Sequence, residues 1–153
     1  MSVIAIDGTF SSGKGTLGKR LSNHYALPYL DTGKLYRAAG YALLQAGDDP
    51  QDETAAARAA RNIDVSTLSN PVLKSADVAV AASKLAVHKE VRSALLTFQR
   101  DFAKGGAILD GRDIGTVICP DADVKLYIDA KAEIRAQRRF EELKGYGLSL
   151  IHI

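Results

Sequence analysis

Residues 3–16 have the sequence VIAIDGTFSSGKGT, in which a short apolar segment leads into a loop of glycine, serine and lysine. Val3–Ile6 is rich in β-branched residues, which predicts a buried strand of a parallel sheet. The loop glycines allow successive backbone N–H groups to point toward one anion, and a helix expected from Thr16 to Tyr25 adds its positive end. The pattern therefore predicts a phosphate-binding loop between a strand and a helix.

The residues of this loop that we expect to hold the phosphates of ATP are Gly8, Ser11, Ser12, Gly13, Lys14, Gly15 and Thr16. Lys14 can reach the β- and γ-phosphates, and a hydroxyl shortly after it can approach Mg²⁺. The usual motif has Ser or Thr directly after the lysine, whereas here Gly15 intervenes and the hydroxyl is that of Thr16. The order Gly-Lys-Gly-Thr resembles the variant of nucleoside monophosphate kinases; an ordinary glycine-rich turn is the alternative.

The rest of the chain alternates between apolar and helical segments. We expect strands at 28–30, 107–109 and 124–128, and helices at 34–45, 54–61 and 132–143. Residues 76–104 are expected to form two helices with a break near Val87 and His88. This alternation predicts an α/β fold of P-loop NTPase type, in which helices flank a parallel sheet. Ligands of such sheets bind at the carboxyl ends of the strands.

Composition narrows the class of protein. The chain has 153 residues, with 20 Lys and Arg against 18 Asp and Glu, and its net charge of +2 gives no support to a nucleic-acid-binding domain. No apolar run approaches the roughly 20 residues that a membrane-spanning helix needs. The single cysteine, Cys119, excludes an internal disulfide. We expect a cytoplasmic monomer that has no nucleic-acid or membrane partner.

Two further motifs follow predicted strands. They are DTGKLYR, residues 31–37, and DGRDIGT, residues 110–116. In this order and at this spacing, they and the phosphate loop resemble the cytidylate kinase family, and RAQRR at 135–139 fits the helix that leads to that family's lid. The resemblance implies a kinase that moves the γ-phosphate of ATP to CMP or dCMP in the presence of Mg²⁺, giving CDP or dCDP.

The resemblance also assigns residues to the acceptor nucleotide. It implies that CMP is bound by Thr32, Tyr36, Arg37, Ser83, Arg92, Arg112 and Asp113. Arg37 and Arg112 suit the CMP phosphate, because a planar guanidinium binds two phosphate oxygens at once. Asp113 and Ser83 can accept from the 4-amino group of cytosine, and Arg92 can donate to its N3 and O2. Uracil reverses this polarity and would be disfavoured. Surface or core positions are the alternatives for Tyr36, Ser83 and Arg92.

The expected catalysis needs no histidine base, because the acceptor is an anionic phosphate and catalysis is mostly positioning and charge neutralisation. Lys14 and Arg112 are expected to act on the reacting phosphates. Asp110 at the tip of its strand and Thr16 are expected to hold Mg²⁺, partly through water.

Three arginines lie on the predicted helix at 132–143. Arg135 and Arg139 share a face because they are four residues apart, and together with Arg138 they could neutralise the transferred phosphoryl group. The alternative is a solvated helix face paired with Glu133, Glu141 and Glu142. We expect Arg135 and Arg139 to be catalytic.

We expect residues 1–147 to form one kinase domain, with 48–105 as an inserted acceptor-binding region. The family continues into an arginine-rich lid and a last strand that the chain lacks, so we expect the strand at 124–128 to be a sheet edge and phosphotransfer to be weak. Residues 148–153, LSLIHI, can be encoded by DNA that resembles a transposase mosaic end, and they are expected to be a non-native tail.

Two other functions stay open from the sequence. One is another small kinase, such as an adenylate or shikimate kinase, which shares the phosphate loop but not the two joined motifs. The other is a non-catalytic nucleotide-binding fragment or pseudoenzyme without a lid. A GTPase is disfavoured, because the chain has no Asn-Lys-x-Asp guanine motif.

Overall fold

The computed structural model describes residues 2–144, which form two compact units. Of the described residues, 2–30 and 105–144 form the sheet unit, and Asp31–Lys104 forms the helical unit. The expected tail at 148–153 and the end of the expected domain at 147 lie outside the described residues. The helical unit begins 17 positions before Asp48, the expected start of the inserted region, because the helix after Asp31 packs against the helices that follow it.

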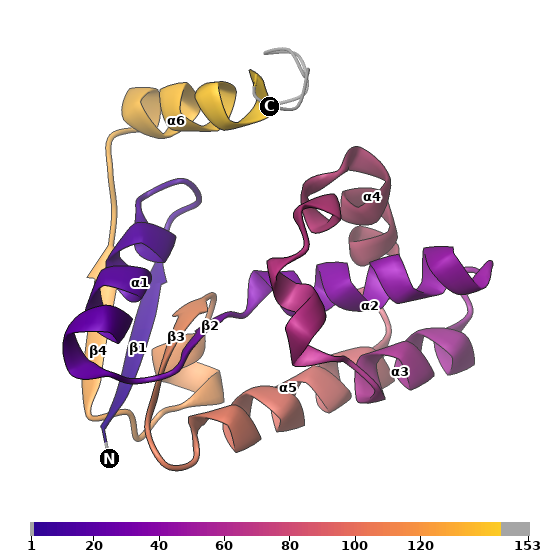
Figure 1. The fold of residues 1–153 in the computed structure, drawn as a ribbon, viewed down its shortest axis with the longest axis horizontal. Helices are drawn as coiled ribbons and strands as arrows, with labels where there is room; N and C mark the ends of the chain where they lie inside the picture. The colour runs from indigo at the N-terminus through magenta and orange to yellow at the C-terminus, as the bar shows by residue number, and fades with distance from the viewer. Residues whose placement is uncertain (1, 145–153) are drawn as a thin grey trace. The chain divides into compact units, whose positions relative to one another are not determined.

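The sheet has four strands, and the predicted α/β fold is confirmed (Figure 1). They are β1 (Val3–Gly8), β2 (Tyr29–Asp31), β3 (Ala107–Gly111) and β4 (Val124–Ile128), arranged in the order β2-β3-β1-β4. β1 pairs in parallel with β3, Ile6 opposite Asp110, and in parallel with β4, Ile6 opposite Leu126. The loops that leave β1, β3 and β4 therefore emerge at the same edge of the sheet. Within the described part of the chain, β4 is an outer strand.

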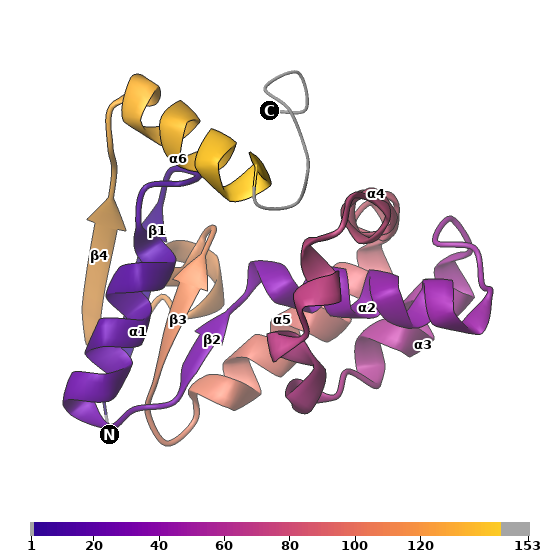
Figure 2. The same cartoon turned by 45° about the horizontal axis from the view of Figure 1, so that its top comes forward.

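The core of the sheet unit lies between the sheet and α1 (Lys14–Tyr25), which packs next to β1 and β3 (Figure 1). Its buried residues are Ile4, Ile6, Leu27 and Ile108, and the partly buried Leu17, Leu21, Tyr29, Leu126 and Ile128 pack against them. After β4 the chain enters α6 (Ala132–Lys144), which lies near the loop between β1 and α1 (Figure 2). This core fixes the strand ends from which the candidate site is built.

The helical unit consists of four α-helices and two short 3₁₀ helices. They are α2 (Gly33–Ala46), α3 (Glu53–Arg61), η1 (Val65–Ser69), η2 (Pro71–Lys74), α4 (Ala76–Leu85) and α5 (Lys89–Ala103). α2 packs against α3 and α4, and α3 packs against α5. A Cβ at Gly40 would lie 3.0 Å from the backbone nitrogen of Ala82, so this glycine allows α2 and α4 to approach closely. None of the helices in residues 2–144 combines the length and the apolar character needed to cross a bilayer.

Candidate active site

The loop between β1 and α1 is held against the end of β4. The backbone N–H of Thr9 donates to the carbonyl oxygen of Ile128 at 3.2 Å, and a Cβ at Gly8 would overlap that carbonyl, so only glycine fits there. Ser11 has φ +58° and Gly13, which caps α1, has φ +103°. Left-handed residues between right-handed ones turn backbone N–H groups toward a common concavity, which is the geometry that binds anions.

Two side chains of this loop are suited to phosphate. The Lys14 ammonium donates to the carbonyl oxygens of Gly8 at 3.2 Å and Thr9 at 2.9 Å, which holds the charge inside the loop. Ser12 is only 6% exposed, and its Oγ is a buried side-chain atom for which residues 2–144 supply no hydrogen-bond partner. A buried hydroxyl without a partner is costly, and a phosphate oxygen would satisfy it.

A carboxylate that the sequence did not single out fixes the first residue of the loop. The Thr9 hydroxyl donates to Asp129 Oδ1 at 2.7 Å, and the Ala130 N–H donates to the same oxygen at 2.8 Å. The hydrogen bond from Thr9, followed by that from Ala130, lowers the pKa of the Asp129 carboxyl below its ordinary value. The available sequence signal was an aspartate directly after the predicted strand at 124–128.

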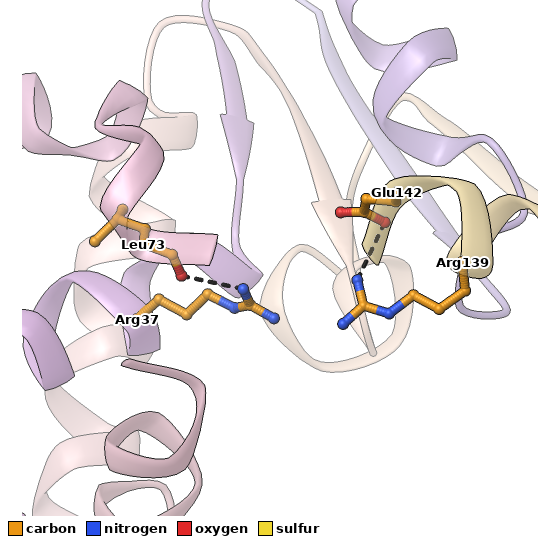
Figure 3. Close-up of polar contacts among 4 residues, drawn as sticks. All are labelled: Arg37, Leu73, Arg139 and Glu142. Atoms are coloured by element: carbon orange, nitrogen blue, oxygen red, sulfur yellow. Dashed lines mark hydrogen bonds and ion pairs between the residues drawn. The ribbon is translucent and has the colours of Figure 1, made fainter. Parts of the chain in front are cut away.

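The arginines of α6 divide between two tasks. Arg138 donates to the carbonyl oxygen of Ser11 at 3.3 Å, and the Arg139 guanidinium lies 4.9 Å from the centre of the Phe10 ring. Arg139 also pairs with Glu142 at 3.1 Å (Figure 3). Arg135 instead donates to the carbonyl oxygen of Ala130 at the start of its own helix. The structure therefore brings Arg138 and Arg139 to the phosphate loop, and Arg135 stabilises the helix start.

Asp110 at the end of β3 is buried and accepts a short hydrogen bond from the Tyr29 hydroxyl. Thr16 is exposed on α1. A hydroxyl and a carboxylate are oxygen ligands of the kind that Mg²⁺ prefers, and this ion is usually held by one or two protein groups together with substrate phosphates. In residues 2–144 no three His, Cys, Asp or Glu side chains form a metal cluster. The two predicted ligands fit an ion that is bound mainly through the nucleotide.

Arg112 and Asp113 lie exposed in the turn after β3. The turn continues into a short π-helix, η3 (Ile114–Ile118), which the sequence did not predict. Asp113 has φ +57°, a left-handed conformation that is uncommon outside glycine but that aspartate tolerates.

The carboxylate of Asp7 accepts from the N–H groups of Ile114 at 2.7 Å and Gly115 at 2.9 Å. Asp7 is a second carboxylate beside the candidate site that the sequence did not single out.

The other residues that the sequence predicts to bind the acceptor nucleotide belong to the helical unit. Thr32 is buried at the start of α2, Ser83 is exposed on α4, and Arg37 donates to the carbonyl oxygen of Leu73 at 3.1 Å (Figure 3). The hydrogen bond to Leu73 fixes the Arg37 guanidinium by one of its nitrogens. The guanidinium has other N–H groups that can serve a ligand.

Tyr36 and Arg92 are close enough in the helical unit to influence each other. Burial raises the pKa of Tyr36 above the ordinary tyrosine value, and the positive charge of Arg92 partly opposes this rise. Arg92 donates to the carbonyl oxygens of Ala86 at 3.0 Å and Val87 at 2.6 Å, which are the free acceptors at the end of α4. Tyr36 is therefore a neutral hydrogen-bonding group near neutral pH.

Known proteins are similar in sequence to this chain over nearly its whole length. The family model described as cytidylate kinase matches residues 4–152. A protein named cytidylate kinase from Rhodopseudomonas palustris (strain ATCC BAA-98 / CGA009) is 55% identical over 147 residues, which cover 95% of this chain and 69% of that protein. One of the same name from Bradyrhizobium sp. (strain ORS 278) is also 55% identical, with the same two coverages.

Among solved structures, an uncharacterized protein from Eubacterium ventriosum ATCC 27560 has a TM-score of 0.50 at 17% identity. The match covers 99% of this chain and 66% of that chain, and at this identity it concerns the fold alone. The chain thus spans 69% of the length of the two relatives and slightly under two thirds of the solved structure.

Proposed function

The chain belongs to the cytidylate kinase family, and on that premise we propose that it transfers the γ-phosphoryl group of ATP to CMP or dCMP. An oxygen of the acceptor phosphate attacks the γ-phosphorus, and the bond to the bridging oxygen of ADP breaks. The products are ADP and CDP or dCDP. The observation that carries the proposal is the buried Ser12 hydroxyl without a partner, in a loop that also holds the Lys14 ammonium.

In this proposal the phosphate loop binds ATP. Backbone N–H groups from Gly8 to Thr16 and the Ser12 hydroxyl surround the phosphates, and Lys14 exchanges its bonds with the loop carbonyls for bonds to the β- and γ-phosphates. Arg138 and Arg139 supply positive charge beside the loop, where negative charge spreads over the transferred group. Arg135 stays a candidate for the same role, although its side chain donates to the carbonyl oxygen of Ala130 in this structure.

The proposal assigns seven residues to the acceptor nucleotide. The residues that bind CMP are Thr32, Tyr36, Arg37, Ser83, Arg92, Arg112 and Asp113. Arg37 and Arg112 hold the CMP phosphate. Asp113 and Ser83 accept from the 4-amino group of cytosine, while Arg92 donates to the ring acceptors, so a uracil base would meet groups of the wrong polarity.

Thr16 and Asp110 would hold Mg²⁺, partly through water. When bound, the ion neutralises charge on the phosphates during transfer. We further propose that the protein acts as a cytoplasmic monomer on small nucleotides, without a nucleic-acid or membrane partner. The small net charge of +2 supports the absence of a nucleic-acid partner.

The test is an ADP-release assay with ATP and, in turn, CMP, dCMP, UMP, AMP and shikimate as acceptors. We expect release of ADP with the two cytidine nucleotides. In Lys14→Met we expect the rate of this release to fall on the order of a hundredfold, because the variant removes a charge that stabilises the transition state. Lys19→Met changes an exposed lysine of the same helix and should leave the rate unchanged. Preference for another acceptor would contradict the substrate. Binding of ATP and CMP without turnover would indicate a non-catalytic module.

A further inference from the structure

The carboxylate of Asp7, near the end of β1, accepts a hydrogen bond from the turn after β3, 107 residues later in the chain. Each of its oxygens accepts from one of two consecutive backbone N–H groups, those of Ile114 and Gly115. Both residues are buried, Ile114 completely. Buried N–H groups at the start of a helix need a partner, and an ionised carboxylate is a strong one. Asp7 therefore holds the backbone directly after Asp113.

The backbone of Asp113 is also held by its own carbonyl. That oxygen accepts from the N–H groups of Val117 at 2.9 Å and Ile118 at 3.0 Å within η3. The left-handed conformation of Asp113 is costly for a residue with a Cβ and persists when its surroundings impose it. Here the surroundings are η3 on the carbonyl side and the Asp7 bonds on the following two amides. The exposed side chains of Arg112 and Asp113 leave the turn free for a ligand.

We propose that Asp7 is a positioning residue for the acceptor nucleotide: it fixes the turn that presents Arg112 and Asp113. This inference rests on the proposed function, which assigns those two side chains to CMP. Although Asp7 immediately precedes the ATP loop, that loop is fixed by other contacts, to Ile128 and Asp129. Loss of the Asp7 carboxylate therefore acts on the recognition of cytosine and leaves ATP binding largely intact.

The first test is Asp7→Asn, which keeps the size of the side chain but replaces one acceptor oxygen by an NH₂ group. This group is a donor and cannot accept from the backbone N–H that faces it. We expect kcat/KM for CMP relative to UMP to fall about tenfold or more, as the loss of a charge-assisted hydrogen bond predicts, while the KM for ATP changes by about twofold at most. A purely structural defect would lower the rates with CMP and UMP equally and keep their ratio.

Asp123→Asn is the matched control. Asp123 is also a carboxylate that accepts from a backbone N–H of β1, that of Val3 at 2.8 Å, but it does so at the opposite end of the strand. Its substitution should leave the ratio of CMP to UMP unchanged. Gly115→Ala tests the same contact from the other side with Asp7 intact, because the new Cβ would lie 3.3 Å from Asp7 Oδ2; it would also lie 3.2 Å from Cγ and Cδ of Lys125, the flexible side chain that can move away. We expect it to lower the ratio in the same direction, and this variant decides the question if Asp7→Asn does not fold.

Hydrogen exchange of the Ile114 and Gly115 amides supplies a readout that is independent of activity. Faster exchange at these amides together with a lower CMP to UMP ratio supports the proposal. A wild-type ratio in Asp7→Asn, or unchanged exchange at both amides, overturns it and leaves the proposed function intact. If the unmodified protein does not prefer CMP over UMP, the proposed function itself fails, and the role of Asp7 in reading the acceptor falls with it.

Discussion

At the scale of single residues, the hydrogen bond between Thr9 and Asp129 links the start of the phosphate loop to the ionised form of this carboxyl. The pKa of Asp129 is lowered first by the Thr9 hydroxyl. A carboxyl whose pKa is lower in the folded than in the unfolded state stabilises the fold above its ordinary range, and this contribution disappears as the pH falls through the lowered value. We therefore predict that Thr9→Val raises the pKa of Asp129 toward that of a free aspartate.

The measurement is an NMR titration of the aspartate carboxyl carbons. Asp64 is an internal control, because its pKa is likewise lowered by hydrogen bonds but its partner is Ser66. In Thr9→Val the titration of Asp64 should stay where it is in the unmodified protein. An Asp129 titration that does not move in this variant would show that Thr9 is not the main cause of the shift.

The candidate residues that lie within a local motif could be predicted from the sequence, and those whose partners are distant in the sequence could not. Lys14 and Ser12 stand in a loop whose spacing identifies them. Asp7 and Asp129 also adjoin strand ends, but their partners lie 108 and 120 positions away, and only the parallel register of the sheet brings them together. Arg138 and Arg135 lie on the same helix, but the side chain of Arg138 donates to Ser11 in the phosphate loop and that of Arg135 donates to Ala130.

At the scale of elements, the contact between α1 and β2 depends on one glycine. A Cβ at Gly18 would overlap the ring of Tyr29, whose hydroxyl is bonded to Asp110 and cannot easily move. Alanine is favoured over glycine in a helix by about 1 kcal/mol. Overpacking of a buried contact costs about 1–3 kcal/mol. Because the neighbour is an anchored ring, we predict that the clash prevails and Gly18→Ala lowers the free energy of unfolding.

Urea denaturation measures this difference. Gly15→Ala is the control for stability, since a Cβ there would lie 3.6 Å from the Tyr29 hydroxyl, an ordinary contact distance in the same helix. We expect it to leave the free energy of unfolding unchanged or to raise it. A Gly18→Ala protein more stable than the unmodified chain would mean that Tyr29 moves without cost and does not fix α1 on the sheet.

Periodicity predicted the strands and α-helices, and their boundaries depended on tertiary contacts. The break between α4 and α5 near Val87 and His88 is confirmed, although no glycine or proline marks it. His88 bonds the Pro50 carbonyl at 2.9 Å at this point. The short helix η3 was missed because the carboxylate that holds its first amides comes from β1. α1 begins at Lys14, two residues before the predicted start, because Gly13 supplies a left-handed cap.

At the scale of the whole molecule, each compact unit has a core of its own. Ile6 and Ile108 are completely buried in the sheet unit, and Leu85 and Leu95 are completely buried in the helical unit. The ATP loop belongs to the sheet unit, whereas Arg37, Ser83 and Arg92 belong to the helical unit. The two substrates should therefore stabilise different parts of the chain. A ligand at 100 times its Kd stabilises the state that binds it by about 2.7 kcal/mol.

We predict that ATP alone slows backbone hydrogen exchange mainly in the phosphate loop and α1, and that CMP alone slows it in α2, α4, α5 and the Arg112–Asp113 turn. Mass spectrometry of exchanged peptides resolves these segments. Adenosine is the control for ATP, because without phosphates it cannot occupy the loop, and it should leave exchange there unchanged. Equal protection of α2 and α4 by ATP alone would contradict the assignment of Arg37 and Ser83 to the acceptor, since a ligand protects first the backbone around the groups that bind it.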